Sequence, residues 1–227
     1  MKIAVLLHGN GVYDGTEIQE AVLSLLAIKE AGHEYQCMAP NYDQHHVINH
    51  VSGEELKEKR NILIESARIA RGDILDLKDV DIQDFDALMM PGGFGTAKNF
   101  TTWAFDGPKA SINPIIANFL TSFQKAEKPI IALCMSPTTL AKAFENSGIN
   151  PKLSVGSTAE KSPYEIAAIS QGMESLGVNA SMTRVNEISI DKANKLICAP
   201  CYMMEADIID VRKNISQAIA ALQEFEE

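Results

Sequence analysis

Short apolar runs alternate along the chain with segments in which apolar residues recur at helical spacing. This pattern is typical of βα units that feed a largely parallel sheet. The first unit comprises a buried strand at 2–7, a loop with three glycines at 8–16 and a helix at about 17–31. Further strands are predicted at 35–39, 87–90, 129–133, near 154, at 187–190 and at 195–199. Further helices are predicted at 115–126, 137–146, 164–176 and about 206–225. We therefore predict an α/β fold with a mostly parallel central sheet.

The stretch at about 41–86 interrupts this alternation. It begins irregularly, continues with a helix-like run at 54–71 and ends in an acidic segment at 73–86. We predict that it is a small insertion between core strands and that it carries a hairpin. A chain of 227 residues fits one domain, 1–227, because α/β sheets covered on both faces commonly reach this size.

Composition argues against several classes of function. The formal net charge is −10 and no dense run of Lys or Arg occurs, so neither nucleic acid nor a membrane is an expected partner. The apolar run at 3–7 is too short for a membrane span or a signal peptide, which favours a cytoplasmic protein. In that reducing compartment the four cysteines are expected to be free thiols. The glycines at 9–15 do not fit the spacing of a dinucleotide fingerprint, so no cofactor is expected.

The most informative residue is Cys134, which follows the apolar run 129–133 directly and precedes a helix that Pro137 helps to begin. A side chain on such a turn projects from the carboxyl end of the sheet, where open α/β folds bind their ligands. The partial positive charge of the helix N-terminus favours a thiolate over a thiol. We therefore expect an ionised nucleophile. The alternative, a buried cysteine that packs as a small apolar residue, stays open.

A second candidate element is the sequence Pro91-Gly92-Gly93, which ends the predicted strand 87–90. Without a Cβ in the way, its backbone N–H groups can approach a ligand closely. Together with the N–H of Met135 they could form an oxyanion hole. A plain glycine turn is the alternative.

The third candidate is Glu20, in the first turn of the first predicted helix. If the loop before this helix adjoins Cys134, the Glu20 carboxyl could act as a general acid or base toward the thiol. The alternative is that it only stabilises the helix N-terminus, a role for which Glu17 competes.

Two other groups of residues suggest chemistry more weakly. His46 and His50 have the i, i+4 spacing of metal ligands, but no acidic partner motif surrounds them, so no metal site is expected. Cys198 and Cys201 have CxxC spacing without a second such motif. We therefore disfavour an independent redox site, while a role for Cys201 in resolving a sulfenic acid on Cys134 stays a hypothesis.

Several of these segments together resemble the ElbB family of glyoxalase-type proteins, within the PfpI-like, class I glutamine amidotransferase-like superfamily. The segments that carry the resemblance are 11–22, 47–50, 60–69, 91–99, Cys134 with Pro137, and 200–203. The resemblance runs nearly end to end. It implies a flavodoxin-like three-layer sandwich and a homodimer.

The resemblance also implies an activity, the cofactor-free conversion of glyoxal or another small aldehyde or dicarbonyl to the hydroxy acid. The implied roles are nucleophile for Cys134, acid and base for Glu20, and anion cradle for the backbone of Gly93 and Met135. His50, Gly92 and Cys201 are predicted to border the site. Because no histidine follows position 50, the usual base of a peptidase or glutaminase is missing and weak catalysis is expected. The alternative function is a non-catalytic or oxidant-sensing amidotransferase-like protein associated with isoprenoid metabolism.

Overall fold

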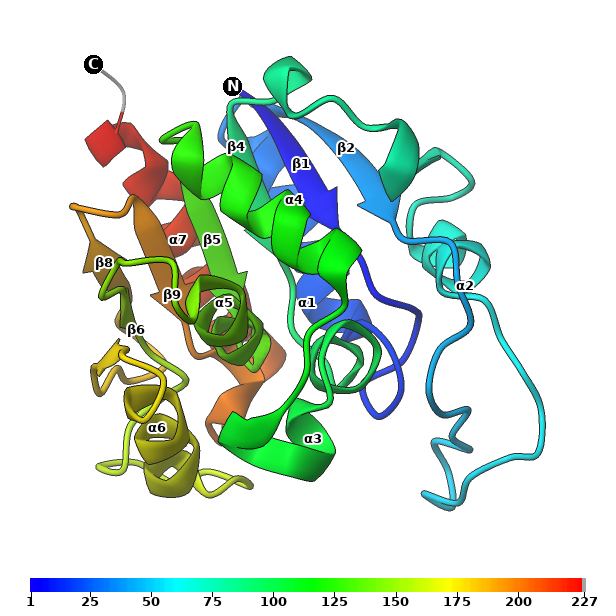
Figure 1. Ribbon diagram of the computed structural model, residues 1–227. Coiled ribbons are helices and arrows are strands. Elements are labelled where there is room, and N and C mark those ends of the chain that lie inside the picture. Colours follow the sequence, from blue (N-terminus) through cyan, green and yellow to red (C-terminus); the bar gives the residue numbers. More distant parts are fainter. Residues whose placement is uncertain (226–227) are drawn as a thin grey trace.

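A computed structural model describes residues 1–225 and contains a seven-stranded sheet between two layers of helices (Figure 1). The strands, in spatial order, are β3 (Ile74–Asp76), β2 (Glu34–Ala39), β1 (Lys2–Leu6), β4 (Ala87–Met90), β5 (Ile130–Leu133), β9 (Leu196–Ala199) and β8 (Ser189–Asp191). All pairings are parallel except that of β8 with β9. A separate parallel pair consists of β6 (Lys152–Leu153) and β7 (Asn179–Ala180). The predicted fold class is confirmed.

Helices cover both faces of the sheet, with α1 and α7 on one side and α4 and α5 on the other (Figure 1). The α-helices are α1 (Ile18–Glu30), α2 (Ile62–Ile69), α3 (Trp103–Asp106), α4 (Pro114–Lys125), α5 (Ser136–Phe144), α6 (Ile166–Glu174) and α7 (Ile208–Ala220). Short 3-10 turns lie at Leu77–Asp79, Ile82–Asp84, Gly107–Lys109, Cys201–Met203 and Ala221–Phe225, and a π-helix lies at Thr96–Phe100. None of the described helices is long and apolar enough to cross a membrane.

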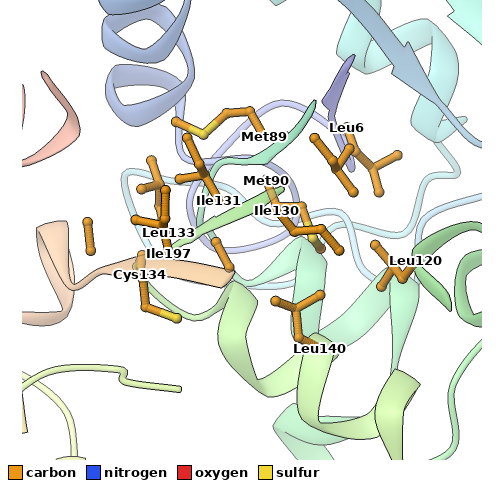
Figure 2. Packing of buried hydrophobic residues seen from close by; sticks show 14 of the residues in the cluster. Leu6, Met89, Met90, Leu120, Ile130, Ile131, Leu133, Cys134, Leu140 and Ile197 are labelled. Atoms are coloured by element: carbon orange, nitrogen blue, oxygen red, sulfur yellow. The ribbon is translucent and has the colours of Figure 1, made fainter. Parts of the chain in front are cut away.

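The core is aliphatic and surrounds the central strands. Every residue of β4 and β5 is buried, as expected for parallel strands that are covered on both faces. Figure 2 shows the packing of Met89 and Met90 of β4 with Ile130 and Ile131 of β5, and Cys134 at the end of the same cluster. Burial of β5 on both faces holds the start of the Cys134 turn in place.

The predicted insertion at 41–86 is only partly an insertion. Its second half contains α2 and β3, which complete a parallel β2-α2-β3 unit at the edge of the sheet. The sequence pattern missed β3 because this short edge strand lies in an acidic segment. The predicted hairpin is present in reduced form, as two isolated antiparallel bridges, Asp43 with Asn61 and Ile48 with Glu55. The helix is shorter than predicted because it begins after Asn61, whose side chain accepts a hydrogen bond from the Ile64 N–H (3.1 Å).

Candidate functional site

Cys134 lies on a sharp turn between β5 and α5. Its φ is +55°, a left-handed conformation that non-glycine residues rarely adopt and that is often found at functional sites. Its N–H donates to the Ala199 carbonyl of the neighbouring strand β9 (2.9 Å), which anchors the turn. The Cys134 side chain is only 5% exposed. The turn thus has the geometry of a nucleophile elbow, with the thiol at the carboxyl end of the sheet.

The Glu20 carboxyl meets the Cys134 thiol beneath this turn. Glu20 is fully buried, and its carboxyl lies within hydrogen-bonding reach of the Cys134 thiol. Its Oε2 accepts the Gly92 N–H (2.8 Å) and its Oε1 accepts the Tyr202 N–H (3.2 Å). Three segments far apart in the sequence therefore hold one carboxyl group against the thiol. Glu20 does not serve only as a helix-terminus charge.

Gly92 and Gly93 keep this contact close. A Cβ on Gly92 would lie 2.2 Å from the Cys134 Cβ and 2.5 Å from Glu20 Oε2. A Cβ on Gly93 would lie 2.4 Å from the Glu17 nitrogen, and the φ of Gly93 is +108°. Because these two glycines lack side chains, the loop that contains them can pack against Cys134, Glu20 and Glu17, and the sulfur also stays accessible.

Burial controls the protonation of Glu20. It raises the pKa of the Glu20 carboxyl to about 8, and the negative charge of Glu17 raises it further in the same direction. The N–H groups of Tyr202 and Gly92 oppose this shift without overcoming it. Burial also raises the pKa of Glu17, whose carboxylate accepts the Glu20 N–H (2.6 Å) as the N-cap of α1. At pH 7 Glu20 is mostly a neutral acid.

The thiolate expected at Cys134 is not its resting state. Burial, followed by the charge of Glu20, raises the pKa of the Cys134 thiol well above its usual value. Hydrogen bonds from the N–H groups of Gly93 and Met135 favour the thiolate, but they do not offset the burial. The prediction of an ionised sulfur is therefore wrong. Loss of solvent around the sulfur outweighs the helix N-terminus, and the thiol requires a base before it can attack.

A small hollow adjoins the thiol, with a cavity volume of about 10 Å³. This volume corresponds to about one water molecule. The residues that line it are Val12, Glu17, Gly93, Phe94, Cys134, Met135, Tyr164, Tyr202 and Met203. The predicted residues Cys134, Gly93 and Met135 are thus brought together at one space. The site as it stands admits only a very small molecule unless its aromatic walls move.

None of the three predicted border residues, His50, Gly92 and Cys201, lines the hollow; Gly92 packs against Cys134 and Glu20 instead. The Nε2 of His50 accepts the Tyr13 N–H (3.2 Å), and the His50 ring stacks on that of Tyr13. Cys201 is fully buried behind the site, and its N–H donates to Asn214 Oδ1 (3.0 Å). Burial raises the pKa of the Cys201 thiol, and the charges of Glu20 and Cys134 contribute in the same direction. Cys201 therefore belongs to the surroundings of the site without facing its opening.

Sequence reasoning missed two tyrosines. The backbone N–H of Tyr202 is the second donor to Glu20, and its hydroxyl is hydrogen-bonded to Gln19. Tyr164 closes the hollow from the segment before α6. Tyr202 lies in the segment 200–203 that contributed to the family resemblance, which was an available signal. No pattern in the sequence distinguishes Tyr164.

A metal role for the histidines is not supported by their positions. The segment that contains His46 and His50 is not helical, so the i, i+4 spacing does not bring them onto one face. Within residues 1–225 no group of three or more His, Cys, Asp or Glu side chains is arranged to hold a metal ion. The four cysteines, all within this part of the chain, are free and buried.

The sheet order and the cysteine turn define a protein with a class I glutamine amidotransferase-like fold. Comparison with known proteins agrees, because residues 1–148 match the DJ-1/PfpI family. The chain belongs to the DJ-1/PfpI family. This family includes enzymes such as glyoxalases and proteases.

Known relatives match nearly the whole chain. It is 37% identical to the ES1 protein homolog, mitochondrial, of Rattus norvegicus, over 99% of this chain and 84% of the relative. It is also 37% identical to the human glutamine amidotransferase-like class 1 domain-containing protein 3, mitochondrial, over 99% of this chain and 83% of the relative. A crystal structure of an isoprenoid biosynthesis protein with an amidotransferase-like domain from Ehrlichia chaffeensis superimposes with a TM-score of 0.88. That protein is 32% identical, and the match covers 100% of both chains.

The prediction of a cytoplasmic location is contradicted by the rat and human relatives and by an ES1 protein of Danio rerio, all of which are named as mitochondrial proteins. The prediction relied on the lack of a long apolar run near residue 1. That observation bears on membrane spans and secretory signals, but mitochondrial targeting segments are amphipathic and rich in arginine. A hydropathy argument therefore cannot separate cytoplasm from mitochondrion.

Proposed function

We propose that this protein is a cofactor-free glyoxalase of the ElbB type, which converts glyoxal or another small dicarbonyl to the hydroxy acid. The observation that carries the proposal is the close approach of the buried Glu20 carboxyl to the Cys134 thiol. A nucleophile and an acid–base group in direct contact are the minimum that this reaction requires. The backbone N–H groups of Gly93 and Met135 are available to stabilise negative charge beside the sulfur.

The reaction begins from the ionised form of Glu20. With a pKa of about 8, about a tenth of the carboxyl groups are ionised at pH 7. The carboxylate takes the thiol proton as the Cys134 sulfur bonds to the aldehyde carbon, and the carbonyl electron pair moves to oxygen. Glu20 then returns the proton to this oxygen, which leaves a neutral hemithioacetal and a carboxylate again.

Proton transfer between the two carbons completes the conversion. The Glu20 carboxylate removes the proton from the hemithioacetal carbon to form an enediolate and returns it to the adjacent carbon, while the hydroxyl proton of the first carbon moves to the oxygen of the second. The product is a thioester of the hydroxy acid with Cys134. Water then cleaves the carbon–sulfur bond, which releases the acid and restores the thiol. The overall change is the addition of one water to glyoxal, so it requires no oxidant or reductant.

Turnover of glyoxal and methylglyoxal by the wild type, Cys134→Ser and Glu20→Gln tests the proposal. We expect measurable turnover by the wild type and a loss of 100-fold or more in both variants, on the order of the effect of removing an acid–base group. Cys37→Ser is the matched control, because Cys37 is also a buried cysteine but lies in β2 away from the hollow. Equal and negligible rates in the wild type and both site variants would contradict the enzyme proposal.

The size of the hollow favours a second candidate function. A space for about one water molecule admits hydrogen peroxide more readily than a dicarbonyl. We therefore also consider that the protein senses oxidants through Cys134 and is associated with isoprenoid metabolism, as in the description of the Ehrlichia chaffeensis protein. Mass spectrometry of Cys134 after exposure to low peroxide tests this. Oxidation of Cys134 in preference to Cys37 supports the sensor, and equal resistance of both excludes it.

A further inference from the structure

A second and larger cavity adjoins the hollow of the Cys134 site. Its volume is about 500 Å³, within the range of small-molecule binding sites. Phe94 and Tyr164 line both spaces. Their rings meet edge to face with centroids 5.8 Å apart, so this pair of rings separates the two spaces. We call the larger space the outer cavity.

Lys98 is the charged residue that lines the outer cavity. It lies on the π-helix Thr96–Phe100, a rare helical form that is frequent at functional sites. Its side chain is partly buried; Nζ donates to the Tyr13 carbonyl (2.8 Å) and lies 5.4 Å from the centroid of the Phe94 ring. Within residues 1–225 no carboxylate oxygen comes within 4.0 Å of this Nζ.

The partly exposed ammonium group therefore has N–H donors that a ligand in the cavity can use. An ammonium carries three N–H donors, and the Tyr13 carbonyl takes one. Partial burial lowers the pKa of Lys98, while the charges of Asp14 and Glu55 act in the opposite direction. An anionic ligand group in the cavity would complete the hydrogen bonds and neutralise the charge. The net charge of −10 provides no general attraction for anions, so the preference proposed is local to Lys98.

Within the described residues, the wall between the cavities is not held by a hydrogen bond of the Tyr164 hydroxyl. Contacts between rings and other side chains hold the Tyr164 ring instead. A swing of this ring would join the outer cavity to the hollow beside Cys134. A ligand longer than glyoxal could then occupy both spaces at once.

We propose that the outer cavity is a tail subsite and that the substrate is a 2-oxoaldehyde with a terminal carboxylate. The carboxylate binds Lys98, the body of the molecule lies against the rings of Tyr13 and Tyr164, and the aldehyde reaches Cys134. The reaction of such a substrate rests on the proposed glyoxalase function. The binding of the carboxylate to Lys98 does not.

Ligand-observed NMR tests the binding step with two unreactive compounds. These are 4-oxopentanoate and 2-pentanone, its neutral counterpart in which a methyl group replaces the carboxylate. We expect the wild type to bind the acid about tenfold more tightly than the ketone, as for a partly exposed charge-assisted hydrogen bond. Lys98→Gln, which keeps a donor for the Tyr13 carbonyl, should lose this preference, and Lys98→Arg should retain it. Absence of the preference in the wild type, or its persistence in Lys98→Gln, overturns the proposal.

Turnover separates this proposal from the proposed function. The substrates are 4,5-dioxopentanoate and 2-oxopentanal, again a carboxylate and its methyl counterpart. We expect kcat/KM for the acid to exceed that for the neutral compound about tenfold in the wild type and to fall to parity in Lys98→Gln. Binding of 4-oxopentanoate through Lys98 without turnover of either aldehyde would support the subsite and contradict the glyoxalase function. Equal turnover of both aldehydes by the wild type and Lys98→Gln would support the glyoxalase function and contradict the subsite.

Discussion

At the scale of single residues, the chemistry depends on which proton the Glu20 and Cys134 side chains release first. Burial raises the pKa of both groups, but that of Glu20 reaches only about 8 while that of the thiol lies higher still. The first proton lost on raising the pH is therefore that of the carboxyl group. The carboxylate so formed is the base that the buried thiol lacks at lower pH. A helix N-terminus alone would have placed the reactive form at a lower pH.

The rate of Cys134 alkylation should therefore rise as the pH increases through about 8. The sign follows from the raised pKa, because below pH 8 the folded protein keeps Glu20 protonated and unable to accept the thiol proton. Iodoacetamide labelling from pH 6 to 10, with Cys134 followed by mass spectrometry, measures the profile. Glu20→Gln should move the rise to higher pH, because the base is lost while burial, which raises the pKa of the thiol more than the charge of Glu20 does, persists. A rate already at its maximum at pH 6 in the wild type would show a depressed thiol pKa instead.

Glu17 provides a separate test of the electrostatics. Its charge raises the pKa of Glu20, so Glu17→Gln should shift the alkylation profile to lower pH. A glutamine still offers an oxygen to accept the Glu20 N–H, which preserves the N-cap of α1. Glu30→Gln, at the other end of the same helix, is the matched control and should leave the profile unchanged. A shift to higher pH in Glu17→Gln would refute this account of Glu20.

At the scale of elements, two loops interlock beneath the site. The Glu17 N–H donates to the Gly92 carbonyl (2.8 Å) and the Phe94 N–H donates to the Val12 carbonyl (2.7 Å). Asn99 of the π-helix adds two hydrogen bonds from its amide to the carbonyls of His8 and Asp14, each 2.9 Å. These contacts fix the start of α1 relative to the end of β4, the strand that pairs with β5. Hydrogen bonds between the loop before α1 and the loop after β4 thus hold Glu20 near Cys134.

Gly92→Ala should disrupt this arrangement. The new Cβ would overlap the Cys134 Cβ at 2.2 Å, so the turn must shift, at a cost of about 1–3 kcal/mol in the free energy of unfolding. Thiol reactivity should change with it, because the Glu20 carboxyl lies in the same contact. Gly32→Ala is the control, since its Cβ meets nothing within 4 Å and only the strain of a φ of +78° is added. Chemical denaturation and the alkylation profile measure both effects; wild-type alkylation in Gly92→Ala would argue against the described packing.

The succession of strands and helices was largely predictable at this scale. The apolar run 129–133 predicts its strand because that strand is buried on both faces. The helical spacing of α4 predicts its helix because one stripe of that helix is buried. The edge strand β3 was not predictable, because its half-exposed position permits an acidic sequence. The π-helix at Thr96–Phe100 also lacks a local signature, and its form depends on the loops that Asn99 holds.

At the scale of the whole molecule, α1 leaves an apolar stripe uncovered. Ile18, Val22 and Leu26 are spaced four residues apart on this helix, and Val22 is 50% exposed. Residues at this spacing lie on one helix face. We propose that the stripe is the contact of the homodimer that the family resemblance implies, since apolar side chains gathered on one face mark interaction surfaces.

Val22→Glu should therefore convert the protein from dimer to monomer. A charge in an apolar contact loses its hydration without gaining a partner, which disfavours association. Light scattering on a size-exclusion column measures the mass. Val51→Glu is the matched control, because Val51 is 98% exposed in the segment between β2 and α2, and it should leave the dimer intact. A wild-type monomer at tens of micromolar would remove the dimer proposal.

The sequence by itself determined the fold class, the central strands and the position of Cys134 at a strand-to-helix turn. These features follow from hydrophobic spacing and from the conformations open to Gly and Pro, which are local properties. Only the tertiary structure decided the protonation of the site and the place of His50, Tyr164 and Lys98. A pKa depends on how much solvent the whole fold removes from a group and on charges that are remote in sequence. For the same reason, the base that serves Cys134 could be proposed from position 20 but its contact with the thiol required the folded chain.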